Sequence, residues 1–243
     1  MIEKHLDIPT PDGSMNAFVV YPEEGGPHPV VLFYMDAPGK REELHDMARR
    51  FAAVGYYVIL PNLYYRRTRD FWLQERTEPA MAVMFTHMNS LNRATTEVDT
   101  AALLKFADAQ PEANASRIGA VGYCMSGPFV MWAAAAFPGR INSIASIHGA
   151  QMATDALDSP HLMAPKIMCE SYFACAETDK WAPPADIAKL ETSLKAAGTA
   201  HRIEWYPGTE HGFVFPQRAG IYNMAAAERH WERMFSLFAR TLR

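Results

Sequence analysis

The chain contains 243 residues, of which 49% are hydrophobic and 12% aromatic, so it can bury a sizeable core and is too apolar for an intrinsically disordered protein. Its 23 Lys and Arg and its 27 Asp and Glu residues give a net charge of −4 and are mixed along the sequence. This balance provides no basic surface for nucleic acid and no polybasic segment for a membrane surface.

The first half of the sequence alternates short apolar runs with a helical pattern. Residues 28–36 and 56–62 are rich in apolar and β-branched side chains and are predicted to form buried strands. The stretch between them has apolar residues at helical spacing and reaches Gly55, a residue typical of helix ends. Segment 64–92 is longer than an ordinary connection, so we expect it to form a lid or a pocket wall.

The second half continues the same alternation. The predicted strands are 117–122, 141–149, 166–177 and 201–208. The predicted helices are 94–109, 127–137, 183–198 and a C-terminal segment that begins near Met224. Such alternation is typical of an α/β fold with a mostly parallel central sheet and helices on both faces. No change of composition divides the chain, so we expect a single domain over residues 1–243.

The sequence also indicates a location and a chemistry without cofactors. Its N-terminal residues lack the apolar core of a signal peptide, and no run approaches the roughly 18 apolar residues of a membrane helix. Its 3 cysteines form no CxxC pair, which favours free thiols in a reducing cytoplasm. None of its 9 histidines has a metal-binding spacing, so we expect no metal and no cofactor.

One cysteine lies between an apolar strand and an apolar helix, in the stretch IGAVGYCMSGPFVMWAAAA (118–136). A sharp strand-to-helix turn pushes its central side chain into the cleft beyond the sheet and requires small neighbours, here Gly122 and Gly127. The positive end of the following helix favours the reactive thiolate. We therefore interpret Cys124 as a nucleophile.

Two alternatives to this interpretation exist. A free cysteine is more often a small buried hydrophobe. Ser126 is a weaker candidate for the nucleophile because it lies past the apex of the turn.

A nucleophile of this kind needs a base and a group that orients the base. In folds of this class the chain order is nucleophile, acid, histidine. Asp179 follows strand 166–177 and His211 lies in a Gly-rich loop after the last strand, so both loops should open at the same sheet edge. Glu177 is an alternative acid. For His148, pocket lining or an ordinary core position is favoured over catalysis.

These residues resemble the dienelactone hydrolase family of α/β-hydrolases over nearly the whole chain. The matching motifs are PDG, VVLFYMDAPG, RRFAAVGYYVILPNLYYR, VGYCMSG, DKWAPP and HGF. The resemblance implies a Cys124–His211–Asp179 triad in an enzyme that hydrolyses esters or lactones. It also implies an oxyanion hole formed by the backbone amides of Ala37 and Met125.

The same resemblance marks departures from the family pattern. Asp36 stands where the family has a glutamate that contacts the resting thiol, so it is predicted to modulate Cys124. Phe215 stands where well-known members carry an arginine for an anionic substrate, and Arg218 lies three residues later. The substrate is therefore predicted to be a small ester or lactone, and its identity is left open.

The predicted substrate pocket is roomy and apolar, suited to an aryl or alicyclic ester. Its candidate lining residues are Met84, His148, Trp181 and Phe213. Two alternatives to a hydrolase stay open: a thiol-based redox or sensor protein that uses Cys124, and a non-catalytic binding module on the same fold. The expected state is a monomer or a small homo-oligomer.

Overall fold

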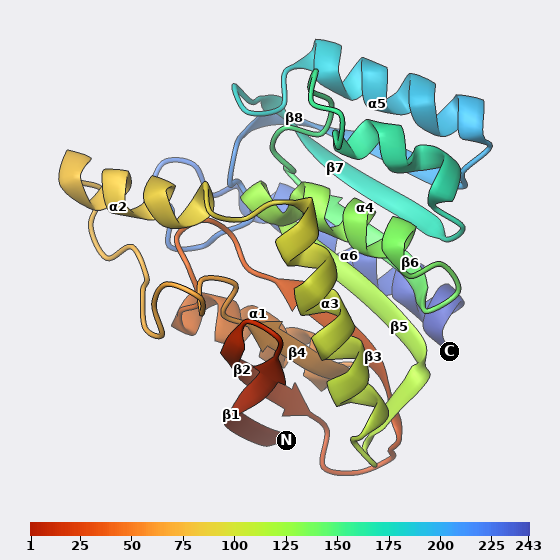
Figure 1. Ribbon diagram of the computed structural model, residues 1–243. Coiled ribbons are helices and arrows are strands. Elements are labelled where there is room, and N and C mark those ends of the chain that lie inside the picture. The colour runs from red at the N-terminus through yellow and green to blue at the C-terminus, as the bar shows by residue number, and fades with distance from the viewer. The chain divides into compact units, whose positions relative to one another are not determined.

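The computed structural model describes residues 1–243, which form two compact units, Met1–Ile118 and Gly119–Arg243. The first unit contains β1 (Ile2–Thr10), β2 (Gly13–Tyr21), β3 (His28–Tyr34), α1 (Glu42–Ala53), β4 (Tyr57–Pro61), α2 (Glu78–Met88) and α3 (Arg93–Asp108). Strand β5 (Ala113–Tyr123) begins in this unit and ends in the second (Figure 1). The expectation of one domain over residues 1–243 stays a prediction.

The strands of the first unit follow the order β1-β2-β4-β3, with β5 next in the sheet. Strands β3 and β4 are parallel, as predicted for the two apolar runs, and Val31 pairs with Val58. Strands β1 and β2 form an antiparallel hairpin that the apolar runs do not predict, and β2 continues antiparallel to β4. The tight turn of the hairpin uses Gly13, whose φ of 133° is open to glycine and strained for other residues.

Three helices pack on this unit or extend from it. Helix α1 contacts β2 and β4, and it buries one face that includes Leu44, Ala48 and Phe51. Helix α3 contacts β1 and begins at Asn92, whose side chain accepts a hydrogen bond from the amide of Thr95. Helix α2 lies within segment 64–92 and buries only Met84, which is typical of a helix added at the edge of a core. The role of this segment as a lid or pocket wall stays a prediction.

The second unit completes the α/β pattern. It contains the 3-10 turn η1 (Cys124–Ser126), α4 (Gly127–Ala136), β6 (Ile141–Ile147), η2 (Pro160–Lys166), β7 (Glu170–Thr178), α5 (Pro184–Ala197), β8 (His201–Glu210) and α6 (Met224–Leu242). The end of β5 is followed in the sheet by β6, β7 and β8. Strands β6, β7 and β8 are all parallel, so the predicted mostly parallel α/β sheet is confirmed.

Helices cover both faces of this second set of strands (Figure 1). Helix α4 contacts β6, whereas α6 contacts β6 and β7 through its buried apolar stripe. Helix α5 begins with Pro183 and Pro184 and ends at Gly198, which adopts a left-handed φ of 68°, as the sequence predicts for a helix with these end residues. Because the strands run in one direction, the loops after β5, β6, β7 and β8 emerge at one end of the unit.

Candidate active site

The turn after β5 holds Cys124 in a left-handed backbone conformation with a φ of 57°. A non-glycine residue in this region is strained, and such strain is concentrated at functional sites. The neighbouring glycines are required by close approach. A Cβ added to Gly122 would lie 2.1 Å from the carbonyl oxygen of Ser126, and one added to Gly127 would lie 2.3 Å from the Cα of Gly149. The thiol itself is half-buried.

Ser126, the alternative nucleophile, is fully buried and is bonded within the turn. Its hydroxyl accepts a hydrogen bond from the amide of Tyr123 at 2.9 Å and donates one to the carbonyl oxygen of Tyr123 at 3.1 Å. These bonds close the turn that carries Cys124. The hydroxyl therefore has a structural function that explains the residue without nucleophilic chemistry.

The predicted acid and base are in direct contact. The Nδ1 atom of His211 lies 2.7 Å from Oδ2 of Asp179, and Oδ1 of the same carboxylate accepts a hydrogen bond from the amide of Trp181 at 2.9 Å. Both oxygens are thus engaged, which fixes the plane of the carboxylate. Glu177, the alternative acid, is exposed and accepts a hydrogen bond from the amide of Gly208.

The electrostatic surroundings of His211 favour its charged form. Burial by itself lowers the pKa of this imidazole, but the negative charge of the Cys124 thiolate and the hydrogen bond to Asp179 outweigh burial. Together they raise the pKa of His211 to about 9. The second ring nitrogen, Nε2, is also buried. Because Nδ1 is the nitrogen that contacts Asp179, Nε2 is the one that remains for proton transfer. His211 can thus hold a proton beside Asp179 and Cys124.

The loop after β6 is hydrogen bonded to the elements that carry Cys124 and Asp179. The amide of His148 donates to the carbonyl oxygen of Ala174 in β7 at 2.7 Å. The amide of Ala150 donates to the carbonyl oxygen of Cys124 at 2.9 Å, and the amide of Gln151 donates to that of Trp181 at 2.8 Å. We name residues 148–151 the β6 loop. It is hydrogen bonded to the turn that holds Cys124 and to the loop that holds Asp179.

Of the predicted pocket residues, His148 lies beside His211, and Phe213 lies beside His148. The ring centroid of His148 lies 4.8 Å from that of His211, and that of Phe213 lies 5.8 Å from His148. Both side chains are buried, whereas Trp181 is 36% exposed. Met84 is buried in α2 of the first unit. The pocket-lining roles of all four stay predictions.

The other predicted site residues lie at the ends of β3 and β5. Asp36 is fully buried and accepts hydrogen bonds from the Arg41 guanidinium at 2.6 and 3.2 Å. The carbonyl oxygen of Ala37 accepts a hydrogen bond from the Tyr64 hydroxyl at 2.8 Å, which fixes the peptide that follows it. Met125 lies in η1, directly after Cys124. The thiol-modulating role of Asp36 and the oxyanion roles of Ala37 and Met125 stay predictions.

Arg218 contacts His211, which the sequence does not predict. Its Nη1 atom donates to the carbonyl oxygen of His211 at 3.3 Å, and its guanidinium lies 4.9 Å from the ring centroid of Phe215. Gly212, beside the folded-back arginine, has a φ of 92°, a conformation that glycine adopts more readily than other residues. Spacing counted along the chain misses this contact because residues 212–218 turn back on themselves.

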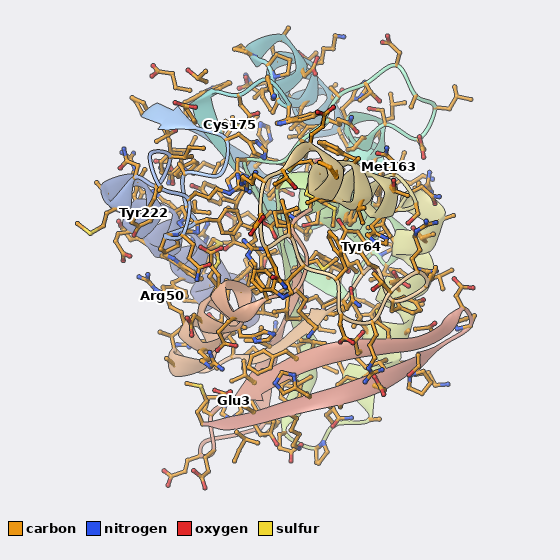
Figure 2. The ribbon with its side chains drawn as sticks, turned by 90° about the vertical axis from the view of Figure 1, so that its left-hand side faces the viewer. Glu3, Arg50, Tyr64, Met163, Cys175 and Tyr222 are labelled. Carbon is orange, nitrogen blue, oxygen red and sulfur yellow. The ribbon has the colours of Figure 1, made fainter.

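The remaining cysteines differ from Cys124. Cys169 and Cys175 are buried, and burial raises the pKa of each thiol to about 12 (Cys175 is labelled in Figure 2). Both are therefore protonated and unreactive near neutral pH.

No group of His, Cys, Asp and Glu side chains has the arrangement of a metal site. No helix has the length and apolar character needed to cross a membrane.

The family comparison agrees with the motifs that the sequence carries. The model described as the Dienelactone hydrolase family matches residues 15–242. A Synechocystis protein provisionally named carboxymethylenebutenolidase is 27% identical over 244 residues, which cover 98% of this chain and 96% of that protein.

Solved structures agree on the fold. A structure from Klebsiella pneumoniae, provisionally described as a dienelactone hydrolase, has a TM-score of 0.88 and 24% identity and covers 98% of both chains. A dienelactone hydrolase-like promiscuous phosphotriesterase from metagenomic libraries has a TM-score of 0.83 and 19% identity, covering 100% of this chain and 99% of that one. At these identities the two structures establish the α/β-hydrolase fold and nothing finer.

Proposed function

Because the chain belongs to the dienelactone hydrolase family, we propose that it hydrolyses a carboxylic ester or a lactone with Cys124 as the nucleophile, His211 as the acid and base, and Asp179 as the group that orients His211. Family membership supports the class of hydrolase. The observation that carries the assignment of residues is the 2.7 Å contact of His211 with Asp179, joined to the thiolate-dependent rise in the pKa of His211.

The first half of the proposed reaction forms a thioester. The thiolate sulfur of Cys124 attacks the carbonyl carbon, and the carbonyl electron pair moves onto oxygen as an oxyanion. The amide of Met125, at the start of the helix, is a suitable donor to this oxyanion, and a donor in this position contributes about 3 kcal/mol in comparable sites. The intermediate then collapses and expels the alkoxide, which takes the proton from Nε2 of His211.

The second half of the reaction needs neutral His211 as a base. Acylation of Cys124 favours the neutral form because it lowers the pKa of His211. Once the sulfur of Cys124 carries an acyl group, it has no negative charge, so the largest cause that raises the pKa of His211 is removed. The neutral imidazole can then take a proton from water. The resulting hydroxide attacks the thioester carbon and expels the Cys124 thiolate, which again pairs with protonated His211.

The family and its relatives narrow the substrate to a class. The name carboxymethylenebutenolidase, which the Synechocystis relative provisionally carries, denotes hydrolysis of a lactone. In this chain Phe215 is buried against Tyr123 and His148, so the position of the family's anion-binding arginine is apolar. The guanidinium of Arg218 lies 4.9 Å from the ring centroid of Phe215, so the proposal names a small ester or lactone without assigning its charge.

Trapping of the acyl group on Cys124 tests this function. The protein is mixed with a panel of aryl esters and five-membered lactones, quenched in acid, and its peptides are analysed by mass spectrometry. We expect an acyl adduct on the peptide that contains Cys124. Cys175→Ala is the matched control because it removes a thiol buried in β7, and it should keep both the adduct and turnover. Undiminished turnover by Cys124→Ala would refute the proposal.

A thiol-based sensor is less well supported. A sensor thiol usually has a resolving cysteine nearby, and here the two other cysteines are buried with pKa values raised to about 12. Modification of Cys124 by peroxide without turnover of any ester in the panel would favour the sensor.

A further inference from the structure

His148 is a fully buried histidine whose two ring nitrogens make no hydrogen bond. Buried polar atoms are nearly always bonded, so such a side chain requires an explanation. Its backbone adds a second exception, because its φ of 38° lies in the left-handed region. A glycine at this position would remove that strain, which costs about 1 kcal/mol for an L-residue. The side chain must therefore make a contact that offsets both the cost of its unbonded nitrogens and the strain of its backbone.

What the side chain contributes is contact with the catalytic group. The ring of His148 meets that of His211 edge to face, with centroids 4.8 Å apart and an angle of 65° between the planes. The ring of Tyr123, the residue before Cys124, lies 6.1 Å away, and that of Phe215 lies 5.5 Å away. One buried ring thus packs against the proposed base, and also against the residue next to the nucleophile.

The backbone that carries the ring of His148 is hydrogen bonded to the segments that hold Cys124 and Asp179. The β6 loop, residues 148–151, is hydrogen bonded to β7, to the carbonyl oxygen of Cys124 and to that of Trp181, as described above. Gly149 also packs closely on Gly127, where α4 begins. A side chain at position 148 therefore keeps a constant relation to the Cys124 turn and to the loop of Asp179.

We propose that His148 is a positioning residue, whose uncharged ring holds the imidazole of His211 in the plane that joins Asp179 to Cys124. The proposal rests on the function assigned above to Cys124 and His211. Hydrogen bonding to Asp179 through Nδ1 leaves the imidazole free to swing about that single contact. The ring of His148 blocks the swing from one side, so Nε2 stays directed at the sulfur.

The same position requires the ring of His148 to be neutral. Burial lowers the pKa of His148 well below its ordinary value, and the charges of His211, Arg218 and His230 lower it further. A second positive charge this close would compete with protonated His211 for the thiolate. With no carboxylate bonded to it, His148 contributes shape and no proton, in contrast with His211.

Alkylation of Cys124 by iodoacetamide across a pH series tests the proposal without any ester substrate. The rate at each pH reports how reactive the sulfur of Cys124 is beside His211. Peptide mapping assigns the product to Cys124. We expect His148→Phe, which keeps a neutral ring, to stay within about threefold of the wild type, and His148→Ala to lose about tenfold or more at low pH, since small misplacements reduce rates by up to about 10²-fold.

Two further variants separate positioning from stability. His148→Leu keeps apolar bulk without a flat ring, so it covers the case in which His148→Ala does not fold, and we expect it to lose low-pH alkylation. Phe238→Leu, in α6, replaces another fully buried ring with a smaller aliphatic side chain and should lower the melting temperature without changing the alkylation profile. Equal profiles for the wild type and the Ala or Leu variant would overturn the inference, as would a loss in His148→Phe equal to that in His148→Ala. Slow, ordinary alkylation of the wild type would instead contradict the proposed function.

Discussion

Two buried aspartates occupy equivalent places in the two units and have different partners. Asp36 follows β3 and is bonded to Arg41 at 2.6 Å, whereas Asp179 follows β7 and is bonded to His211 at 2.7 Å. Arg41 also contacts Glu43 at 2.6 Å, so its guanidinium is held between two acids. In sequence, each aspartate comes just after an apolar parallel strand.

The partners decide what each carboxylate can do. A guanidinium never releases its proton in proteins, and although burial opposes its charge, Asp36 and Glu43 raise the pKa of Arg41 above its ordinary value. The pair of Asp36 is therefore a permanent ion pair. The imidazole of His211 has a pKa of about 9, so this partner of Asp179 can gain and lose a proton during a reaction. The comparison shows that the partner decides whether an acid at a strand end belongs to a permanent ion pair or to a pair that titrates.

Replacement of Asp179 has the largest expected effect on this comparison. Asp179→Asn keeps the shape of the side chain but removes the charge that orients and stabilises protonated His211, so kcat for an ester should fall by about 10³–10⁴-fold. Loss of the charged hydrogen bond should also lower the pKa of His211, which is measurable in the pH profile of Cys124 alkylation.

The matched control for Asp179→Asn is Glu177→Gln, which neutralises the alternative acid two residues earlier. Glu177 is exposed and accepts a hydrogen bond from the amide of Gly208, so kcat should change by less than about twofold. Equal losses in the two variants would remove the distinction between Asp179 and an ordinary loop acid.

The fold follows from sequence patterns wherever strands are apolar throughout. Runs such as residues 28–34 and 141–147 are nearly all buried, so hydrophobic continuity locates them. The hairpin of β1 and β2 is missed because β1 is largely exposed, and its IEKHLDIPT sequence has no continuous apolar run. Strand β5 begins at Ala113, earlier than the apolar core of the run, because its first residues are half-buried or exposed.

Sequence patterns also predict some features of the candidate site and miss others. Cys124, Asp179 and His211 can be predicted because each follows a strand, and parallel strands bring such loops together. The pairing of Asp36 with Arg41, the contact of His148 with His211 and the return of Arg218 to His211 all depend on side-chain direction. Apolar periodicity carries no information on that direction, so the structure is needed to find these contacts.

The pH dependence of stability should separate the titrating pair from the permanent one. The pKa of His211 is raised in the folded protein from 6.5 to about 9, so its stabilising contribution is complete below about 6.5 and decreases as pH rises toward about 9. At about 1.4 kcal/mol per pKa unit, the loss is at most about 3 kcal/mol, because part of the rise depends on the charge of Cys124. Urea unfolding at a series of pH values measures it, and His211→Gln should show a flatter profile over the same interval. A wild-type profile as flat as that of the variant would contradict the raised pKa.

Replacement of Asp36 has the smallest expected effect of these changes and acts on stability. Asp36→Asn leaves the buried Arg41 with a weaker partner, but Glu43 still neutralises the guanidinium, so the free energy of unfolding should fall by about 2 kcal/mol. The control is Asp46→Asn, which removes the 68%-exposed partner of Arg49 and should cost less than about 0.5 kcal/mol. Urea unfolding measures both variants, and alkylation of Cys124 adds a second readout. A permanent ion pair predicts the loss of stability with an unchanged alkylation profile, whereas a shifted profile would mean that Asp36 modulates the thiol and that the two aspartates share one function.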